Sequence, residues 1–186
     1  MDALRIISED HNNLWRLATT VDQVATEIEG GAAVEQPFFN AVFDYIEQFV
    51  DRSHHPKEDD VLFVKILEVM PELAPLIAKL QNDHVQGARS TLALRDALKQ
   101  YQQTGAAGFS DFDRVASLYI ESSWKHLGVE EKELLPLARQ RLAPQDWAGI
   151  DAAFEANKDP WSGPAGEFKA LFSRIVNMVP APYGVG

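Results

Sequence analysis

The sequence contains no cysteine. This single absence excludes disulfide frameworks, thiolate metal sites, iron–sulfur clusters and a cysteine nucleophile. Any metal that the chain binds must therefore be held by nitrogen and oxygen atoms.

Positive charge is also scarce, with 17 Lys and Arg residues against 28 Asp and Glu residues and a formal net charge of -11 at pH 7. A surface of this sign repels nucleic acid and anionic lipid, so we expect neither as a partner. No apolar run reaches the roughly 20 residues of a membrane span. Ser8, Glu9 and Asp10 interrupt the region where a signal peptide would carry its apolar core. The sequence therefore predicts a cytoplasmic protein.

Sustained strand-like alternation is missing, and apolar residues recur instead at steps of three and four in long segments. Gly30, Pro71 and Gly105 mark the connections between these segments. The pattern predicts an all-α fold, an up-down-up-down four-helix bundle over residues 1–142 with additional C-terminal helices. The four predicted helices cover about residues 4–28, 34–69, 73–101 and 110–142.

Residues 143–186 are predicted to form a helical appendage. Pro144 to about Asn157 carries apolar residues at helical spacing, and a second amphipathic piece runs from Phe168 to Val179. We expect this appendage to pack on the bundle or to cover a dimer face, which leaves a homodimer open.

Histidines are distributed one per predicted helix for four of the five in the chain. His11 and His84 take positions on the inward stripe that would otherwise be apolar. Burying an imidazole costs free energy unless both ring nitrogens find partners, so converging histidines need a shared partner. A metal ion supplies one. The four histidines are His11, His54, His84 and His126.

Two of these histidines are each followed, four residues later, by a glutamate on the same helix face. The pairs are His54 with Glu58 and His126 with Glu130. They align at an offset of 72 residues, and the dipeptides Asp10-His11 and Asp83-His84 align at an offset of 73. The chain thus reads as two copies of one helix pair, which predicts a site with pseudo-twofold symmetry.

Both helices that carry a His-x-x-x-Glu pair are weakened within that turn, by Pro56 in one copy and Gly128 in the other. We expect a kink or widened turn there that aims the carboxylate at the metal.

Ligand counting favours two metals. Four imidazoles and two bridging glutamates, with an oxo or hydroxo bridge, give each ion about five contacts and leave one position open. Nitrogen and oxygen donors suit iron, with manganese or zinc as alternatives, and an open position on buried iron invites dioxygen or nitric oxide.

The order of these residues resembles the hemerythrin-like, HHE cation-binding family over about residues 3 to 142. The resemblance implies an up-down four-helix bundle around a non-haem di-iron centre, with both glutamates bridging. The positions to which it assigns metal-ligand roles are His11, His54, Glu58, His84, His126 and Glu130.

Ala88 departs from one branch of that family. Dioxygen-carrying hemerythrins place a second histidine four residues after the one that matches His84, and this sequence has Ala88 there. The four-histidine, two-glutamate set is more similar to bacterial proteins linked to repair of iron centres under nitrosative stress, and to iron- and oxygen-sensing hemerythrin-like domains. Those repair proteins usually carry a cysteine-containing segment, so the resemblance to them is partial.

Two functional classes stay open. The protein is a binding or sensing module for dioxygen, nitric oxide or iron, or it is an enzyme of oxidative or nitrosative stress defence. The sequence slightly favours the first, because it names no substrate cleft or catalytic acid–base pair. A metal-free bundle with satisfied core histidines and a bis-histidine haem bundle are the competing readings, although haem would leave both glutamates without a role.

The neighbouring polar residues receive simpler interpretations. His55 lies about 100° around a helix from His54, so we expect either a partly exposed neighbour of the site or a group that supports a ligand without binding the metal itself. The acids Asp59, Asp60, Glu131 and Glu133 are expected to be solvated, although one of them could orient a ligand.

Overall fold

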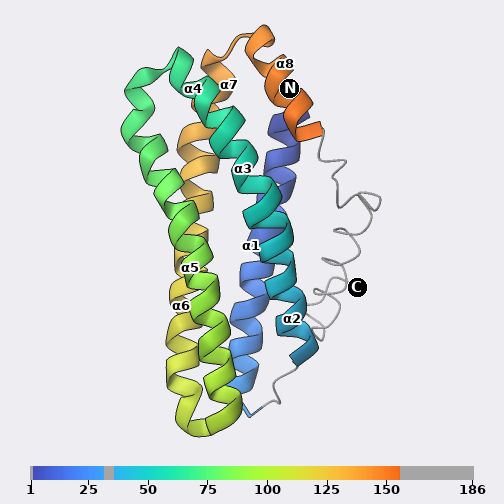
Figure 1. Cartoon of the computed structure of the whole chain (residues 1–186), viewed down its shortest axis with the longest axis vertical. Helices are drawn as coiled ribbons and strands as arrows, with labels where there is room; N and C mark the ends of the chain where they lie inside the picture. Colours follow the sequence, from blue (N-terminus) through green and yellow to red (C-terminus); the bar gives the residue numbers. More distant parts are fainter. Residues whose placement is uncertain (1, 32–35, 156–186) are drawn as a thin grey trace.

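The computed structural model describes residues 2–31 and 36–155, and these residues form an all-α bundle (Figure 1). Four helical columns run alternately up and down, as the sequence predicted. The first column is α1 (Asp2–Glu29), and the second comprises α2 (Gln36–Tyr45), η1 (Ile46–His54), α3 (His55–Lys57), η2 (Glu58–Leu62) and α4 (Phe63–Val69). The third comprises η3 (Pro71–Leu73) and α5 (Ala74–Thr104), and the fourth comprises α6 (Ala106–Val129), η4 (Glu130–Leu134) and α7 (Leu135–Arg141).

The columns end where the backbone cannot stay helical. Met70 has φ -133° and ψ 68°, because a residue before proline is pushed out of the helical region. Gly105 has φ 60°, a left-handed conformation that glycine adopts without steric cost, and it reverses the chain between α5 and α6.

Two separate apolar clusters fill the interior. The distal cluster lies toward the Gly31 and Gly105 ends of the helices and is represented by Val21, Phe39, Val42, Leu94 and Phe112. The proximal cluster lies at the other end and includes Ile7, Phe63, Ile66, Leu80 and Leu134. Each fully buried side chain of this kind contributes roughly 1.5–3 kcal/mol to folding. This stabilisation on both sides offsets the cost of a buried polar layer between the clusters.

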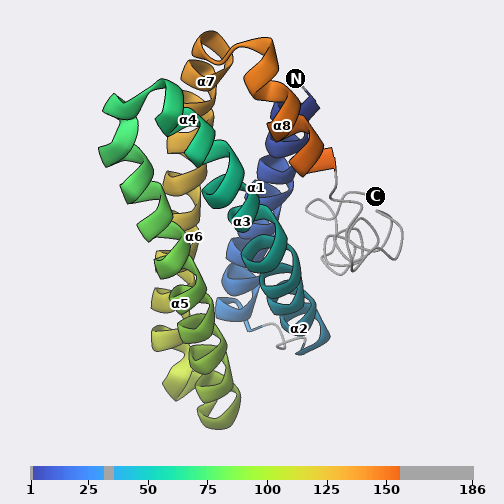
Figure 2. The same cartoon turned by 45° about the horizontal axis from the view of Figure 1, so that its top comes forward.

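The helix α8 (Pro144–Glu155) returns along the bundle beside the start of α1 (Figure 2). Its residues Trp147, Ile150 and Phe154 are buried in the proximal cluster. The Asp151 carboxylate accepts a hydrogen bond from the Ala3 backbone N–H at 2.9 Å. The first predicted segment of the appendage is therefore helical and packed, whereas Phe168 to Val179 lies outside the described residues. Among the helices of residues 2–31 and 36–155, none is both long and apolar enough to cross a bilayer.

Three stretches of the second and fourth columns are π-helical, namely η1, η2 and η4. The segments η2 and η4 begin at Glu58 and at Glu130, so they occupy the same place in the two halves. The Phe63 N–H bonds to the Glu58 carbonyl, and the Leu135 N–H bonds to the Glu130 carbonyl. The predicted widened turn is thus present, but in these two segments it follows each glutamate.

The fourth column shows why that prediction was only partly correct. The Glu130 N–H still reaches the His126 and Leu127 carbonyls, so the turn between histidine and glutamate keeps tight hydrogen bonding there. A side chain at Gly128 would meet open space, so packing does not require glycine at this position.

Candidate metal centre

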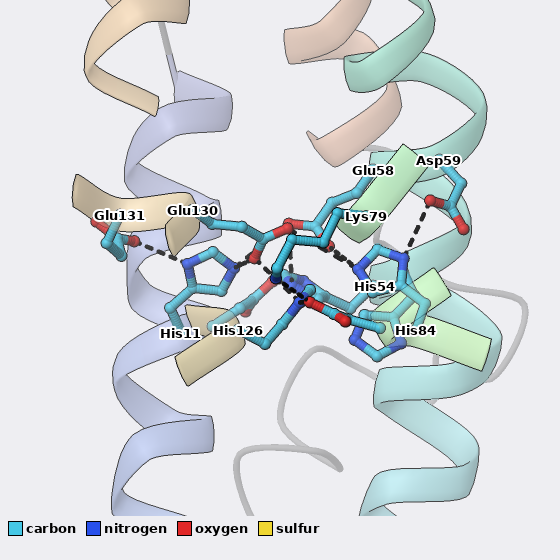
Figure 3. Close-up of polar contacts among 12 residues, drawn as sticks. His11, His54, Glu58, Asp59, Lys79, His84, His126, Glu130 and Glu131 are labelled. Carbon is cyan, nitrogen blue, oxygen red and sulfur yellow. Dashed lines mark hydrogen bonds and ion pairs between the residues drawn. The ribbon is translucent and has the colours of Figure 1, made fainter. Parts of the chain in front are cut away.

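The polar layer between the two clusters gathers all six residues to which the sequence assigned metal-ligand roles (Figure 3). All four columns contribute at least one of them. The histidines come from α1, η1, α5 and α6, and the glutamates come from the first residues of η2 and η4. Both glutamate side chains are only 1% exposed.

Glu58 faces imidazoles from both halves of the bundle. Its Oε1 lies 3.3 Å from His11 Nε2 and 3.4 Å from His54 Nε2. Its Oε2 lies 3.6 Å from His84 Nε2. The two oxygens of one carboxylate thus point at different histidine groups, which is the arrangement that a bridging ligand needs.

Glu130 repeats this arrangement from the opposite column. Its Oε2 lies 3.3 Å from the Nε2 atoms of both His11 and His126. Its Oε1 lies 3.9 Å from His84 Nε2. Every one of the four histidines therefore turns its Nε2 atom toward the two central carboxylates.

The outward nitrogen of each imidazole faces a second carboxylate. Because an acid at Nδ1 holds the proton on that nitrogen, it leaves the Nε2 lone pair free for a cation. The pairs are His11 with Glu131 at 2.8 Å, His84 with Asp59 at 3.0 Å, His54 with Asp10 at 3.2 Å and His126 with Asp83 at 3.8 Å. The last distance is too long for a hydrogen bond.

These outer acids follow the duplication found in the sequence. Each acid that precedes a histidine, Asp10 or Asp83, faces the histidine of the next column. Each acid that follows a central glutamate, Asp59 or Glu131, faces a histidine of the other half. The pseudo-twofold symmetry thus extends to the outer carboxylates.

Two of the four outer acids contradict the simpler expectation. Asp59 and Glu131 are not merely solvated surface acids, because each hydrogen-bonds an inward-facing histidine. Asp60 and Glu133 are exposed, as expected. The roles of Asp10 and Asp83 were missed, although the repeated Asp-His dipeptide marked both of them.

His55 is a partly exposed neighbour of the site, as the sequence suggested, and it packs against a central histidine. Its ring stacks on that of His84 with 3.9 Å between centroids and an interplanar angle of 11°. Its side chain is 14% exposed, and its Nδ1 lies 3.7 Å from Asp51 Oδ1. Burial and the charge on His84 hold the pKa of His55 well below its usual range, so the ring is neutral.

The pKa values of the site show how strongly these acids attract positive charge. Burial alone would lower the pKa of His11, but hydrogen bonds to Glu131 and Glu58 outweigh it and raise that pKa to about 10. Burial would likewise lower the pKa of His84, but the nearby carboxylates of Glu130 and Glu58 outweigh it and raise that pKa to about 9. Burial would raise the pKa of Glu58, yet the charges of His54 and His11 hold it below its usual range. Metal cations compete with protons for such a cluster.

The donor atoms fit a metal by a second criterion. Buried polar atoms normally find hydrogen-bond partners, and those left without one need another explanation. Several central donors are buried without such a partner, and a cation among them would satisfy all of these atoms at once. They are Glu58 Oε2, His84 Nε2, His126 Nε2, Glu130 Oε1 and Glu130 Oε2.

A cavity of about 290 Å³ lies between this polar layer and the distal cluster. One wall is apolar and includes Leu14 and Leu127, while His84 and His126 line the end nearest the site. The cavity extends to exposed residues of α5 and α6, including Gln86 and Lys125. Its polar lining includes Asp51, His55, Thr91, Tyr119 and Ser123.

Buried imidazoles and carboxylates that converge from four antiparallel helices define a metal-binding helical bundle. The family model described as the hemerythrin HHE cation binding domain matches residues 2–138. The chain belongs to this family. No curated protein and no solved structure matches the chain. Family membership and the buried histidine–glutamate clusters together indicate that the domain binds a metal cation.

Proposed function

We propose that this chain is a non-haem di-iron protein that binds or senses dioxygen, nitric oxide or iron. The observation that carries the proposal is the position of the two central carboxylates, each of which has oxygens directed at histidines of both halves. The ligands in this proposal are His11, His54, Glu58, His84, His126 and Glu130.

The donor count supports a pair of ions. Four imidazole nitrogens and four carboxylate oxygens, with one oxo or hydroxo bridge, give each ion about five contacts. His11 and His54 group with Glu58 on one side, and His84 groups with both glutamates on the other. Nitrogen and oxygen donors without sulfur suit iron, with manganese or zinc as alternatives.

When bound, the irons supply open coordination positions for a small ligand and a change of oxidation state. The protein contributes a buried site, outer acids that fix the imidazole tautomers, and an approach through the cavity that reaches His84 and His126. Ligand occupancy can be transmitted outward, because Glu58 and Glu130 begin π-helical segments whose following residues, Leu62 and Leu134, pack in the proximal cluster with α8.

The test begins with metal analysis. The full chain is freed of metal, supplied anaerobically with ferrous iron, and examined by elemental analysis and visible spectroscopy. We expect about two irons per chain. Titration of the reduced protein with dioxygen and then nitric oxide should give saturable spectra that revert when the gas is removed. A chain that retains fewer than two ions of iron, manganese or zinc would refute the proposal.

The cavity favours a second candidate, a di-iron enzyme that reduces peroxide or dioxygen in stress defence or assists iron-centre repair. Asp51 and Tyr119 line the cavity together with His84 and His126, so acid groups lie along the approach to the site. Continuous consumption of peroxide or dioxygen in the presence of a reductant would favour this enzyme, whereas a single stoichiometric uptake would favour binding or sensing.

A further inference from the structure

The π-helical segment η1 breaks the symmetry between the two halves of the bundle. At the offset of 72 residues that aligns the two His-x-x-x-Glu pairs, η1 aligns with residues 118–126, which are regular α-helix within α6. Single π-helical turns frequently mark functional positions, and a run of nine residues such as η1 is unusual. The metal ligands are arranged alike in both halves, so the centre gives no reason for a π-helix on one side alone.

The cavity beside the polar layer lies against this segment. Ile46, Val50 and Asp51 of η1 all line it. Hydrogen bonds between residues five apart bring side chains four and five positions apart onto one helix face. Asp51 thereby brings a carboxylate to a cavity whose opposite wall includes Leu17. The residue that aligns with Asp51 in the other half is Ser123, which lines the same cavity without a charge.

The nearby cations of the protein are engaged away from Asp51. Arg52, the next residue, pairs with Glu47 at 3.1 Å. His55 Nδ1 lies 3.7 Å from Asp51 Oδ1, which is too long for a hydrogen bond, and burial keeps this imidazole neutral. Both ring nitrogens of His84 face other carboxylates. Because burial alone disfavours an ionised carboxyl group, a cation in the cavity would stabilise Asp51.

The hydroxyl groups of the cavity also present acceptors. Thr91 Oγ1 donates its proton to the Gly87 carbonyl at 3.1 Å. Ser122 and Ser123 both donate to the Tyr119 carbonyl at 2.9 Å. A hydroxyl group that donates to the backbone keeps oxygen lone pairs for another donor. The lining therefore favours a ligand that donates hydrogen bonds and carries a positive charge.

The dimensions of the cavity suit a small organic molecule. Its volume of about 290 Å³ lies near the lower end of the range for ligand pockets. Because one water molecule takes about 30 Å³ of the liquid, this volume corresponds to roughly ten non-hydrogen atoms. Among the lysines of the lining, Lys79 is paired with Asp83 and Lys125 is exposed to solvent, which screens its charge. The net charge of -11 attracts cations to the chain.

We propose that this cavity binds a small organic amine, with the ammonium group on Asp51 and an apolar chain or ring against Leu17, Ile46 and Val50. Recognition needs no metal, because the charge that it uses belongs to Asp51. The cavity is also the approach to His84. A bound amine would therefore slow the access of small ligands to the metals, a consequence that rests on the function proposed above.

The experiment is calorimetric titration of the full chain with two probes near neutral pH. One is 2-phenylethylamine, which is then an ammonium ion, and the other is 2-phenylethanol, which has as many non-hydrogen atoms and no charge. We expect the amine to bind at least about 10-fold more tightly, because hydrogen bonds between charged groups are the stronger ones. Asp51→Asn should weaken amine binding about 10- to 100-fold and leave alcohol binding unchanged. Asp44→Asn is the matched control, because it removes an exposed charge of the same column outside the cavity, and it should bind both probes as the wild type does.

Gly87→Leu tests the location of the ligand. Gly87 lines the cavity and a side chain there would meet open space, so leucine should fill the cavity and weaken the binding of both probes. Circular dichroism checks that each variant folds. Equal affinities for the two probes, equal effects of Asp51→Asn and Asp44→Asn, or undiminished binding in Gly87→Leu would overturn the proposal.

Visible spectroscopy of the iron-loaded chain separates this site from the metal centre. An amine-dependent change in the spectrum that persists in Asp51→Asn would place the amine on the metal and would also overturn the proposal. A chain without metal can still be titrated with both probes, so failure of the di-iron proposal and failure of this one are distinguishable.

Discussion

The outer carboxylates allow a comparison between two nearly matched positions. Asp59 and Asp83 are equally exposed, at 29% and 30%, and each faces a histidine Nδ1. The Asp59 distance to His84 is 3.0 Å, whereas the Asp83 distance to His126 is 3.8 Å. Asp83 is also engaged by Lys79 at 2.5 Å. Only Asp59 is therefore placed to hold the proton on its histidine and to raise the basicity of Nε2.

The expected magnitude follows from the hydrogen bond that is altered. Outer partners of metal ligands typically contribute 10- to 100-fold to metal affinity, or about 1.4–2.8 kcal/mol. An amide still accepts the Nδ1–H bond but carries no charge, and neutral hydrogen bonds are roughly half as strong as charged ones. We therefore expect Asp59→Asn to weaken metal binding about tenfold and Asp83→Asn to weaken it less than about threefold.

The assay is competition between each metal-free variant and a chelator of known affinity, with the number of bound ions measured at every point. Glu131→Gln extends the series, because Glu131 accepts the shortest of the four bonds, at 2.8 Å from His11 Nδ1. Equal losses in Asp59→Asn and Asp83→Asn would show that charge near the site matters and tautomer control does not. Unchanged affinity in both Asp59→Asn and Glu131→Gln would refute the role assigned to the outer acids.

Three further predictions concern the whole bundle. Glu130→Ala should lose both metals, because the carboxylate faces histidines of both halves; one firmly bound ion by elemental analysis would exclude bridging. Burial raises the pKa of Asp51 from 3.8 to about 6, so the metal-free protein should lose stability from this group as the pH rises from about 4 to above 6. The loss should stay below about 3 kcal/mol, because solvent screens this partly exposed carboxylate. Asp51→Asn should remove that loss in urea unfolding at pH 4 and pH 8. Phe154→Ala should cost about 3–5 kcal/mol, since Phe154 is fully buried in the proximal cluster. Leu118→Ala, at an exposed position, is its control. Equal shifts of the urea unfolding midpoint in Phe154→Ala and Leu118→Ala would contradict the packing of α8.

The fold was predictable because its signals are local. Apolar spacing defined the four columns. Helices end at Met70, which precedes a proline, and at Gly105, which has a positive φ, as the sequence predicted. The π-helical turns were located less well. Pro56 and Gly128 are local marks, whereas the turns after Glu58 and Glu130 depend on how two helices fit around one polar layer.

The site was predicted to the extent that it follows helix faces. His11, His54, His84 and His126 each occupy an inward position, and the structure brings them together with both glutamates. Those acids whose partners lie on another helix were harder to assign, since spacing within one helix does not reveal contacts across the bundle. The stacking of His55 on His84 was not foreseen for a related reason, because the regular helix used to direct His55 is interrupted by η1.

The polar layer lies between the distal and proximal apolar clusters and so divides the interior into two compartments. Without a cation, the central imidazoles and carboxylates link these compartments only by contacts of 3.3–3.9 Å, so each end can open with little help from the other. Bound metal ions would join ligands from all four columns, so the two compartments would unfold as one cooperative unit. The supply of metal would then govern how long the protein survives proteolysis as well as what it can bind.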